Sequence, residues 1–517
     1  SRLRHKRTST IMAIKKYLAI ADTTISNAFD QTFLTSNTAT GSNMGASDIL
    51  EVFSLYGQSS SSSGLSSELS RVLVQFNTAQ IETDRTAGTI PTASAVSFYL
   101  KLYNARHPET LPKDYSMTIS AVSQSWQEGD GLDMVNYTDK TLGLSGSTWT
   151  YRGTEGAWTS AGGDYHASPT FEASFPEGNE DIEVNVTSLV EEWLRGDKQN
   201  YGFGLSLTSA IEAREKTFYT KKFFARGTEF YYKRPCLEAR WDDSKQDDRE
   251  MFFLSSSLAP AEDNLNKIYL YNVVRGRLRN IPSIGTDNIY VSIYSGSALN
   301  NAPSGSPLDL VEDGIHVSEN YPNVITGSHV STGIYSAIFA FTGSSTLTKV
   351  YDVWFSGSGT LTSADGALQL STGSIELDRF SADVFNPSKR YILSLSNLRE
   401  SYGSTEKARF KLYIRPRDWA PTIHTRASNI PETTIITSAS YEIFRASDGL
   451  KVIPFGTGSD YHTALSYNVS GNYFDLDMSN FEEDQMYGVR FAFYDDAVGS
   501  WNTQPYEFNF KVRNNEY

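Results

Sequence analysis

Hydrophobic residues in this chain recur mostly at every second position or in short continuous runs, which is the pattern of β-strands. Glycine, proline, serine or asparagine bounds most of these segments. The predicted strands are residues 71–76, 96–103, 116–122, 267–274, 288–294, 348–355, 408–414, 440–444, 487–494 and 506–512. The pattern therefore predicts an all-β protein.

One segment has helical spacing instead. Within residues 184–195, apolar positions recur three and four residues apart, up to Trp193. Thr187 is suited to cap the start, and Gly196 can take the left-handed conformation that ends a helix. We expect one short helix here, with Trp193 as a buried structural anchor against the sheet.

Two breaks divide the 517 residues, which are too many for one ordinary core. Residues 242–250 are charged and polar, and Trp419 precedes Ala420 and Pro421. The expected order is three β-sandwich domains in series: a jelly-roll-like sandwich at 12–243, a second sandwich at 251–418 and an Ig-like sandwich at 420–517.

Residues 1–11 stand apart because they contain four Arg and Lys residues and one His in the first seven positions. This basic extension is either a solvated terminus or an arm that contacts an acidic partner. Met12 has the context of a translation start.

Composition narrows the functional class. The formal net charge of -15 disfavours nucleic-acid binding outside the basic arm. Cys236 is the single cysteine, so neither an intrachain disulfide nor a cysteine-based zinc site can form. No apolar run reaches the roughly 20 residues needed to cross a bilayer, so no membrane contact is expected.

Candidate chemistry is sparse. The sequence has no Gly-x-Ser-x-Gly elbow, phosphate loop or His-Glu-x-x-His motif, and acidic pairs such as Glu128 and Asp130 are typical of solvated loops. We therefore expect no enzymatic activity. Four aromatic residues in one Gly/Ser/Thr-rich stretch could stack on sugar rings, or else fill the open end of the sandwich. They are Trp149, Tyr151, Trp158 and Tyr165.

A family resemblance covers residues 12–243. Its motifs occur in order as Ala21-Asp-Thr-Thr-Ile25, Arg71-Val-Leu-Val-Gln-Phe76, Gly162-Gly-Asp164, Leu189-Val-Glu-Glu-Trp193 and Arg234-Pro-Cys-Leu-Glu-Ala-Arg-Trp241. This series resembles the DNRLRE family, with Ala239 where the family has Val. The resemblance implies a jelly-roll-like module of surface, adhesive and carbohydrate-associated proteins, without catalytic residues.

Calcium is the one metal to consider. Sandwich modules of this kind can hold structural Ca²⁺ on loop carboxylates. The candidate ligands are Asp22, Asp133 and Asp164. No other cofactor is expected.

The later domains, rich in Tyr, Phe, Ser, Gly and Asn, resemble structural proteins of marine tailed bacteriophages. That resemblance implies a virion protein of the neck, tail, fibre or capsid surface, with copies of itself and other virion proteins as partners. A host surface glycan is a further candidate partner. The alternative is a cell-surface or secreted carbohydrate-binding or adhesion protein.

Overall fold

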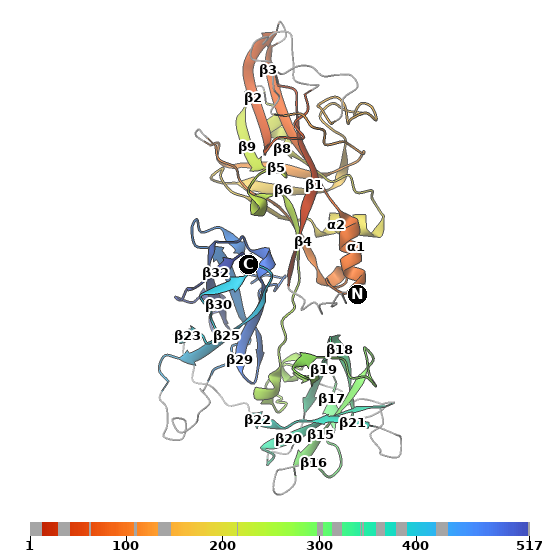
Figure 1. The fold of residues 1–517 in the computed structure, drawn as a ribbon, viewed down its shortest axis with the longest axis vertical. Helices are drawn as coiled ribbons and strands as arrows, with labels where there is room; N and C mark the ends of the chain where they lie inside the picture. The colour runs from red at the N-terminus through yellow and green to blue at the C-terminus, as the bar shows by residue number, and fades with distance from the viewer. Residues whose placement is uncertain are drawn as a thin grey trace.

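The structure is a computed structural model. It describes residues 13–28, 42–61, 64–107, 111–132, 146–214, 216–296, 303–312, 323–341, 343, 346–357, 368–378, 390–419 and 433–514. The basic extension, Met12 and Asp133 lie outside these ranges. The described residues form three β-units with few helices, so the all-β prediction is confirmed (Figure 1).

The first unit spans residues 13–241, and its strands pair antiparallel in the order β6-β5-β8-β3-β1-β10-β4-β7, with β2 beside β3 and β9 beside β2. The strands are β1 (Ile14–Ser26), β2 (Ile49–Ser61), β3 (Gly64–Phe76), β4 (Ser97–Leu102), β5 (Tyr115–Val122), β6 (Tyr165–Phe175), β7 (Ile182–Asn185), β8 (Phe203–Leu207), β9 (Phe218–Phe224) and β10 (Cys236–Arg240). A bulge between Ala19 and Ala21 divides β1. The first half of β1 pairs with β10 and the second half pairs with β3, so this one strand connects β10 to β3 in the sheet.

The described residues of this unit form three α-helices, where one was expected: α1 (Thr78–Thr86), α2 (Thr187–Arg195) and α3 (Ser209–Glu212). Helix α2 begins later than residue 184 because β7 pairs with β4 up to Asn185, whose side chain accepts the Thr187 N–H. Gly196 ends it at φ +79°. Helix α1 gave no periodic signal, because Ile81 is its one buried apolar residue.

A serine run such as that at 59–63 is a composition usual for a flexible loop. Instead, β2 continues through Ser61 and pairs with the start of β3, where Ser61 lies opposite Gly64. Residues 62 and 63 lie outside the described ranges. The run thus belongs largely to a long hairpin.

The second unit, residues 252–378, has a main sheet in the order β11-β22-β20-β15-β18-β19-β12, with β16, β17 and β21 at its sides, and a separate two-stranded sheet of β13 and β14. The Asn266 side chain accepts a hydrogen bond from Phe253 N and donates one to Phe253 O. These bonds join β11 to β12, the first and last strands of this order, and Trp354 is fully buried in the unit. The strands are β11 (Phe252–Phe253), β12 (Asn266–Tyr271), β13 (Val273–Val274), β14 (Arg277–Leu278), β15 (Ile289–Gly296), β16 (Pro303–Ser304), β17 (Leu310–Val311), β18 (Ile325–Ser331), β19 (Ile334–Phe341), β20 (Lys349–Ser356), β21 (Leu368–Thr372) and β22 (Ile375–Asp378).

The third unit, residues 391–513, is a sandwich of two sheets, ordered β23-β25-β29-β28 and β24-β32-β30-β26-β27, with β31 beside β30. Phe410, Phe474 and Phe491 lie in the core between them. The strands are β23 (Tyr391–Leu395), β24 (Ser401–Gly403), β25 (Lys407–Pro416), β26 (Ala439–Arg445), β27 (Lys451–Ile453), β28 (Ser466–Asn468), β29 (Gly471–Asp477), β30 (Met486–Asp495), β31 (Ser500–Thr503) and β32 (Phe508–Arg513).

The expected boundary between 251–418 and 420–517 is therefore corrected. Strands β23 and β25 pair with each other, and β25 pairs with β29, so the last strands assigned to the second domain belong to the third. Beyond the Trp419 break the chain returns to the same strand, since Thr434 donates its N–H to Ile414 O. The described residues on both sides of that break therefore belong to the same sandwich.

The chain runs from the first unit to the second and then back, so that the third unit lies against the first (Figure 1). Residues 242–250 join the units and are themselves fixed. Asp247 N donates to Tyr467 O, and Tyr467 N donates to Lys245 O, so the segment lies alongside β28. Arg249 donates two hydrogen bonds to the buried Asp352 of the second unit, each 2.7 Å long.

We expect trypsin to spare this segment in the native protein, although Lys245 and Arg249 are both cleavage residues. The backbone around them is hydrogen-bonded, and proteases need locally unfolded chain. Mass spectrometry of early fragments checks this, with the urea-unfolded chain as the control that is cut at both residues. Early native cleavage after Lys245 would show that the segment is a free linker.

Candidate functional site

The four aromatic candidates for sugar stacking do not form an exposed face. Trp149 and Trp158 are only 7% and 5% exposed, and Tyr151 and Tyr165 are partly buried. The indole of Trp158 donates to Thr148 O at 3.0 Å. Both tryptophan rings therefore fill a small apolar cluster on the first unit, and a sugar ring cannot reach their faces.

Arg71 of β3 organises this cluster. Its guanidinium lies over the rings of Trp149 and Tyr165, and it donates two hydrogen bonds to Glu212 of α3. Gly162, at φ +91°, accepts a third hydrogen bond from Arg71 on its carbonyl. A Cβ at Gly162 would lie 2.9 Å from the Trp149 ring, so the Gly-Gly-Asp motif has a packing reason.

The proposed calcium ligands are engaged otherwise. Asp22 is 2% exposed and accepts the Arg226 N–H at 2.6 Å, and burial raises the pKa of its carboxyl to about 7. Asp164 accepts the N–H groups of Thr159 and Ser160. Asp133 lies outside the described residues. Within the part of the chain that the structure describes, no group of three His, Cys, Asp or Glu side chains is placed to hold a metal ion.

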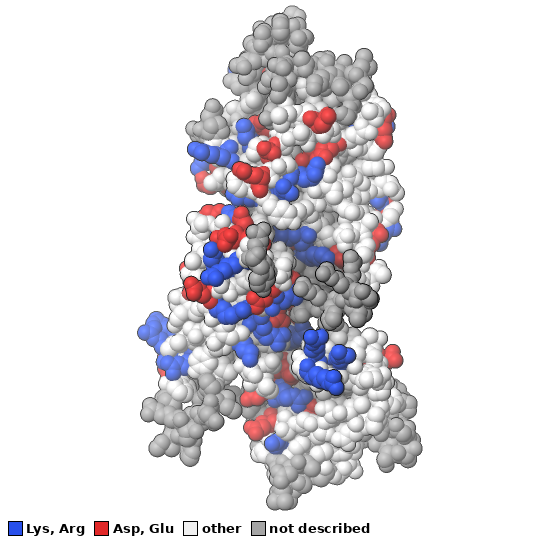
Figure 2. All heavy atoms as spheres, viewed as in Figure 1, with Lys and Arg blue, Asp and Glu red and all other residues white. Residues whose placement is uncertain are grey.

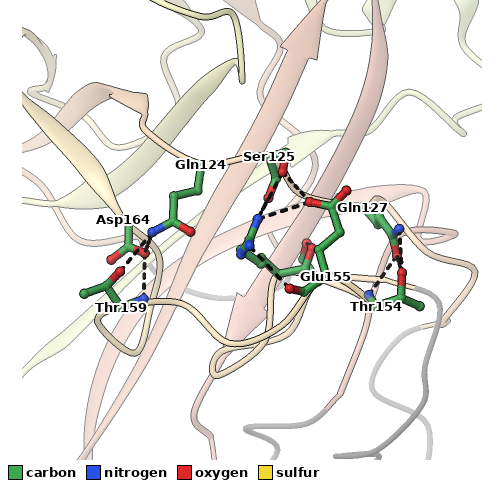
Figure 3. Close-up of polar contacts among 9 residues, drawn as sticks. Gln124, Ser125, Gln127, Thr154, Glu155, Thr159 and Asp164 are labelled. Carbon is green, nitrogen blue, oxygen red and sulfur yellow. Dashed lines mark hydrogen bonds and ion pairs between the residues drawn. The ribbon is translucent and has the colours of Figure 1, made fainter.

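The loops around Asp164 are held together by polar side chains (Figure 3). Gln124 donates to both Thr159 and Asp164, and Gln127 donates to Thr154. These contacts join the loop after β5 to the loop before β6. Asp164 thus has a structural role that hydrogen bonds account for.

A more developed site lies where the first unit meets the third (Figure 1). Tyr99 of β4 donates its hydroxyl to Asp460 at 2.5 Å, and Tyr232 donates to Phe481 O. Ile14 of β1 belongs to the apolar core of the third unit. The two units therefore share buried surface.

Charged side chains are buried at this junction. Strand β10 alternates, so that Leu237 and Ala239 face the core of the first unit while Glu238 and Arg240 face outward. Register places Glu238 between Lys16 of β1 and Tyr99 of β4. Glu238 and Arg240 are only 0% and 3% exposed, because the third unit lies over this side of the sheet.

The ion pairs of this cluster determine whether Glu238 and Lys16 are charged. Burial alone would raise the pKa of Glu238, but Lys101, Arg240 and Lys16 outweigh it and lower that pKa to about 2. Arg240 bonds Glu238 at 2.7 Å and Glu183 at 2.7 Å. Lys16 is less well compensated: its ammonium lies 3.9 Å from Glu238, and burial lowers its pKa.

His462 of the third unit belongs to the same region. It is 2% exposed, and neither ring nitrogen has a hydrogen-bond partner among the described residues. Burial, reinforced by the positive charge of Arg240, lowers the pKa of its imidazole to about 4. His462 is therefore neutral at neutral pH.

A pocket of about 400 Å³ opens beside this cluster, between β1 and β10 of the first unit and β25 of the third. Lys and Arg side chains lie among Asp and Glu side chains around the junction in Figure 2. The charged lining residues are Lys15, Lys16, Arg234, Lys407 and Asp477, and Tyr231, Tyr232 and Trp241 supply aromatic surface.

Sequence reasoning missed this pocket. In the sequence, Lys15 and Lys16 only interrupt an apolar stretch, and Arg234 lies in the series that resembles the DNRLRE family. The alternation of β10 would have indicated one charged face, but that pattern is usual for a solvent-facing strand. No local signal places Lys407, which comes from the third unit.

Comparisons with known proteins give no family. No family model matches the chain, and no curated protein matches it. Among solved structures, a chimeric titin Z1Z2-Z1Z2 tandem with an exogenous fibronectin peptide matches with 12% identity, a TM-score of 0.14 and coverage of 52% of this chain and 95% of that chain. The first two Ig domains of DIP-gamma match with 10% identity, a TM-score of 0.12 and coverage of 52% and 93%.

A third solved structure is a DUF4785 family protein from Legionella pneumophila. It has 8% identity and a TM-score of 0.13, and the match covers 97% of this chain and 90% of that one. Within the described residues, no helix is long and apolar enough to cross a membrane.

Proposed function

We propose that this chain is a non-catalytic structural protein that works by assembly, as a component of a tailed-phage virion. The phage class rests on the resemblance of the later units to such proteins. The assembly mechanism rests on one surface feature, the hairpin β13–β14 of the second unit. Its described neighbours hold it in place but leave its side chains uncovered.

The hairpin combines apolar and cationic side chains. Val273, Val274 and Leu278 are 57%, 45% and 39% exposed, and Val273 lies directly opposite Leu278. Arg275 and Arg277 are exposed too, and neither forms an ion pair with any described residue. Arginine and apolar side chains are the material of protein–protein interfaces.

The base of the hairpin is fixed. Asn272 donates its N–H to Gly333 O in the turn between β18 and β19, and its side chain donates to Arg279 O. Lys and Arg side chains gather over the part of the second unit where β18 and β19 lie (Figure 2). A fixed hairpin binds with less loss of conformational entropy than a free loop would.

The occupant that we propose is a second copy of this chain. The chain carries a formal net charge of -15, while residues 271–279 contain three arginines and no acidic residue. Opposite charge favours the encounter of a cationic hairpin with an acidic neighbour. Contacts of this kind should bury on the order of 1,000 Å² in a specific interface.

We expect self-association that Arg277→Glu weakens by about tenfold, since the change places a carboxylate against an acidic neighbour. Sedimentation velocity of the full chain over a concentration series measures this. The matched control is Arg195→Glu, which changes an arginine of the first unit whose side chain is 57% exposed. This variant should associate like wild type. A strictly monomeric wild type, or equal association of Arg277→Glu, would contradict the assembly mechanism.

A further inference from the structure

We infer that the pocket between the first and third units is an anion site that takes a phosphate group. This inference goes beyond the assembly function and does not depend on it, because the pocket lies within a single chain. The observation behind it is an excess of positive charge in a protein that is acidic overall.

The excess follows from the ion pairs. Lys15 pairs with Asp84 at 2.6 Å and Lys407 with Asp477 at 3.4 Å, so these two cations are compensated. Arg234 donates to the backbone carbonyl of Thr228 and pairs with no carboxylate among the described residues.

Lys16 adds a second cation that is only partly compensated. It shares Glu238 with Lys101 and Arg240, and Glu183 is the only other carboxylate that pairs with those three cations in the described chain. Three cations against two carboxylates leave one positive charge here, and Arg234 supplies another. A surplus of two charges suits a dianion such as phosphate.

The surroundings suit such a ligand. A volume of about 400 Å³ lies in the usual range for small-molecule sites. Ser479 and Asn480 of the third unit also line the pocket, where their side chains donate to Asp477. Tyr231, whose side chain is 51% exposed, provides an aromatic surface beside the cations for a group that carries the phosphate.

Isothermal titration of the full chain with inorganic phosphate, and separately with glucose 6-phosphate, tests the site at constant ionic strength. We expect saturable binding, weakened about tenfold by Arg234→Gln because a charged hydrogen-bond donor is lost. Tighter binding of the sugar phosphate would assign the site to an organic phosphate, and equal affinities would assign it to free phosphate. Both outcomes support the inference.

Lys407→Gln and Lys451→Gln form a matched pair that guards against misfolding of the Arg234 variant. The two lysine side chains, 44% and 63% exposed, belong to the third unit and each pairs with a carboxylate, but only Lys407 lines the pocket. Lys407→Gln should weaken phosphate binding at least about threefold and Lys451→Gln should leave it unchanged. Absence of saturable binding by wild type, or equal affinity in the Lys407 and Lys451 variants, would overturn the inference.

Discussion

Replacing Trp193 by alanine should lower the free energy of unfolding of the first unit by about 3–5 kcal/mol. The side chain is 5% exposed, and its ring packs edge-on against Phe203 of β8 with centroids 4.8 Å apart. Removing the indole therefore leaves a cavity between α2 and the sheet. Urea denaturation, followed through hydrogen exchange of the β8 amides, measures the change in the unit concerned.

Trp501→Ala is the control for this substitution. Trp501 lies in β31 at the side of a sheet in the third unit, is only partly buried and contacts the partly exposed Tyr494. We expect a much smaller effect there, and none on the β8 amides. If the Trp193 variant unfolds at the same urea concentration as wild type, helix α2 does not depend on that side chain.

Replacing Glu238 by glutamine should destabilise the junction by about 3–5 kcal/mol at neutral pH, because it leaves Lys16, Lys101 and Arg240 with too little negative charge. The effect should depend on pH. The pKa of Glu238 is about 2 in the folded chain, below the value of about 4.3 for an unfolded glutamate. Its stabilising contribution is thus complete above about pH 4.3 and is lost as the pH falls toward 2.

Urea denaturation at a series of pH values tests this expectation. The difference between wild type and Glu238→Gln should be largest near pH 7 and should shrink below about pH 4.3. Glu400→Gln is the control, because Glu400 is exposed. A difference between wild type and Glu238→Gln that stays constant down to pH 2 would show that the cluster does not hold Glu238 as a carboxylate.

Strands were predictable from sequence because their alternation is local. The run at 71–76 lies within β3 and that at 487–494 lies within β30. Apolar side chains on one face of a strand pack against a hydrophobic core, and the sequence pattern is the same for any core. The same property explains the wrong boundary. Strand β25 alternates between buried and exposed residues, but that pattern does not reveal whether it faces the second or the third core.

The site was less predictable for a related reason. A polar face on β10 is usual for a strand in contact with water, and its burial depends on a unit more than 150 residues further along the chain. The tryptophan-rich stretch posed the opposite problem. Its composition suited both a sugar-binding surface and a packed cluster. The contacts of Arg71 with the rings of Trp149 and Tyr165 depend on the tertiary structure, so the local sequence does not show them.

We propose above that this chain is a structural component of a virus particle. Quantitative mass spectrometry of purified particles, normalised to the major capsid protein, tests it most directly. We expect a fixed copy number per particle that high-salt washing leaves unchanged and that is a multiple of the rotational symmetry order of the attachment site. Absence of the chain from the particles, or an amount that falls with each wash, would contradict the claim.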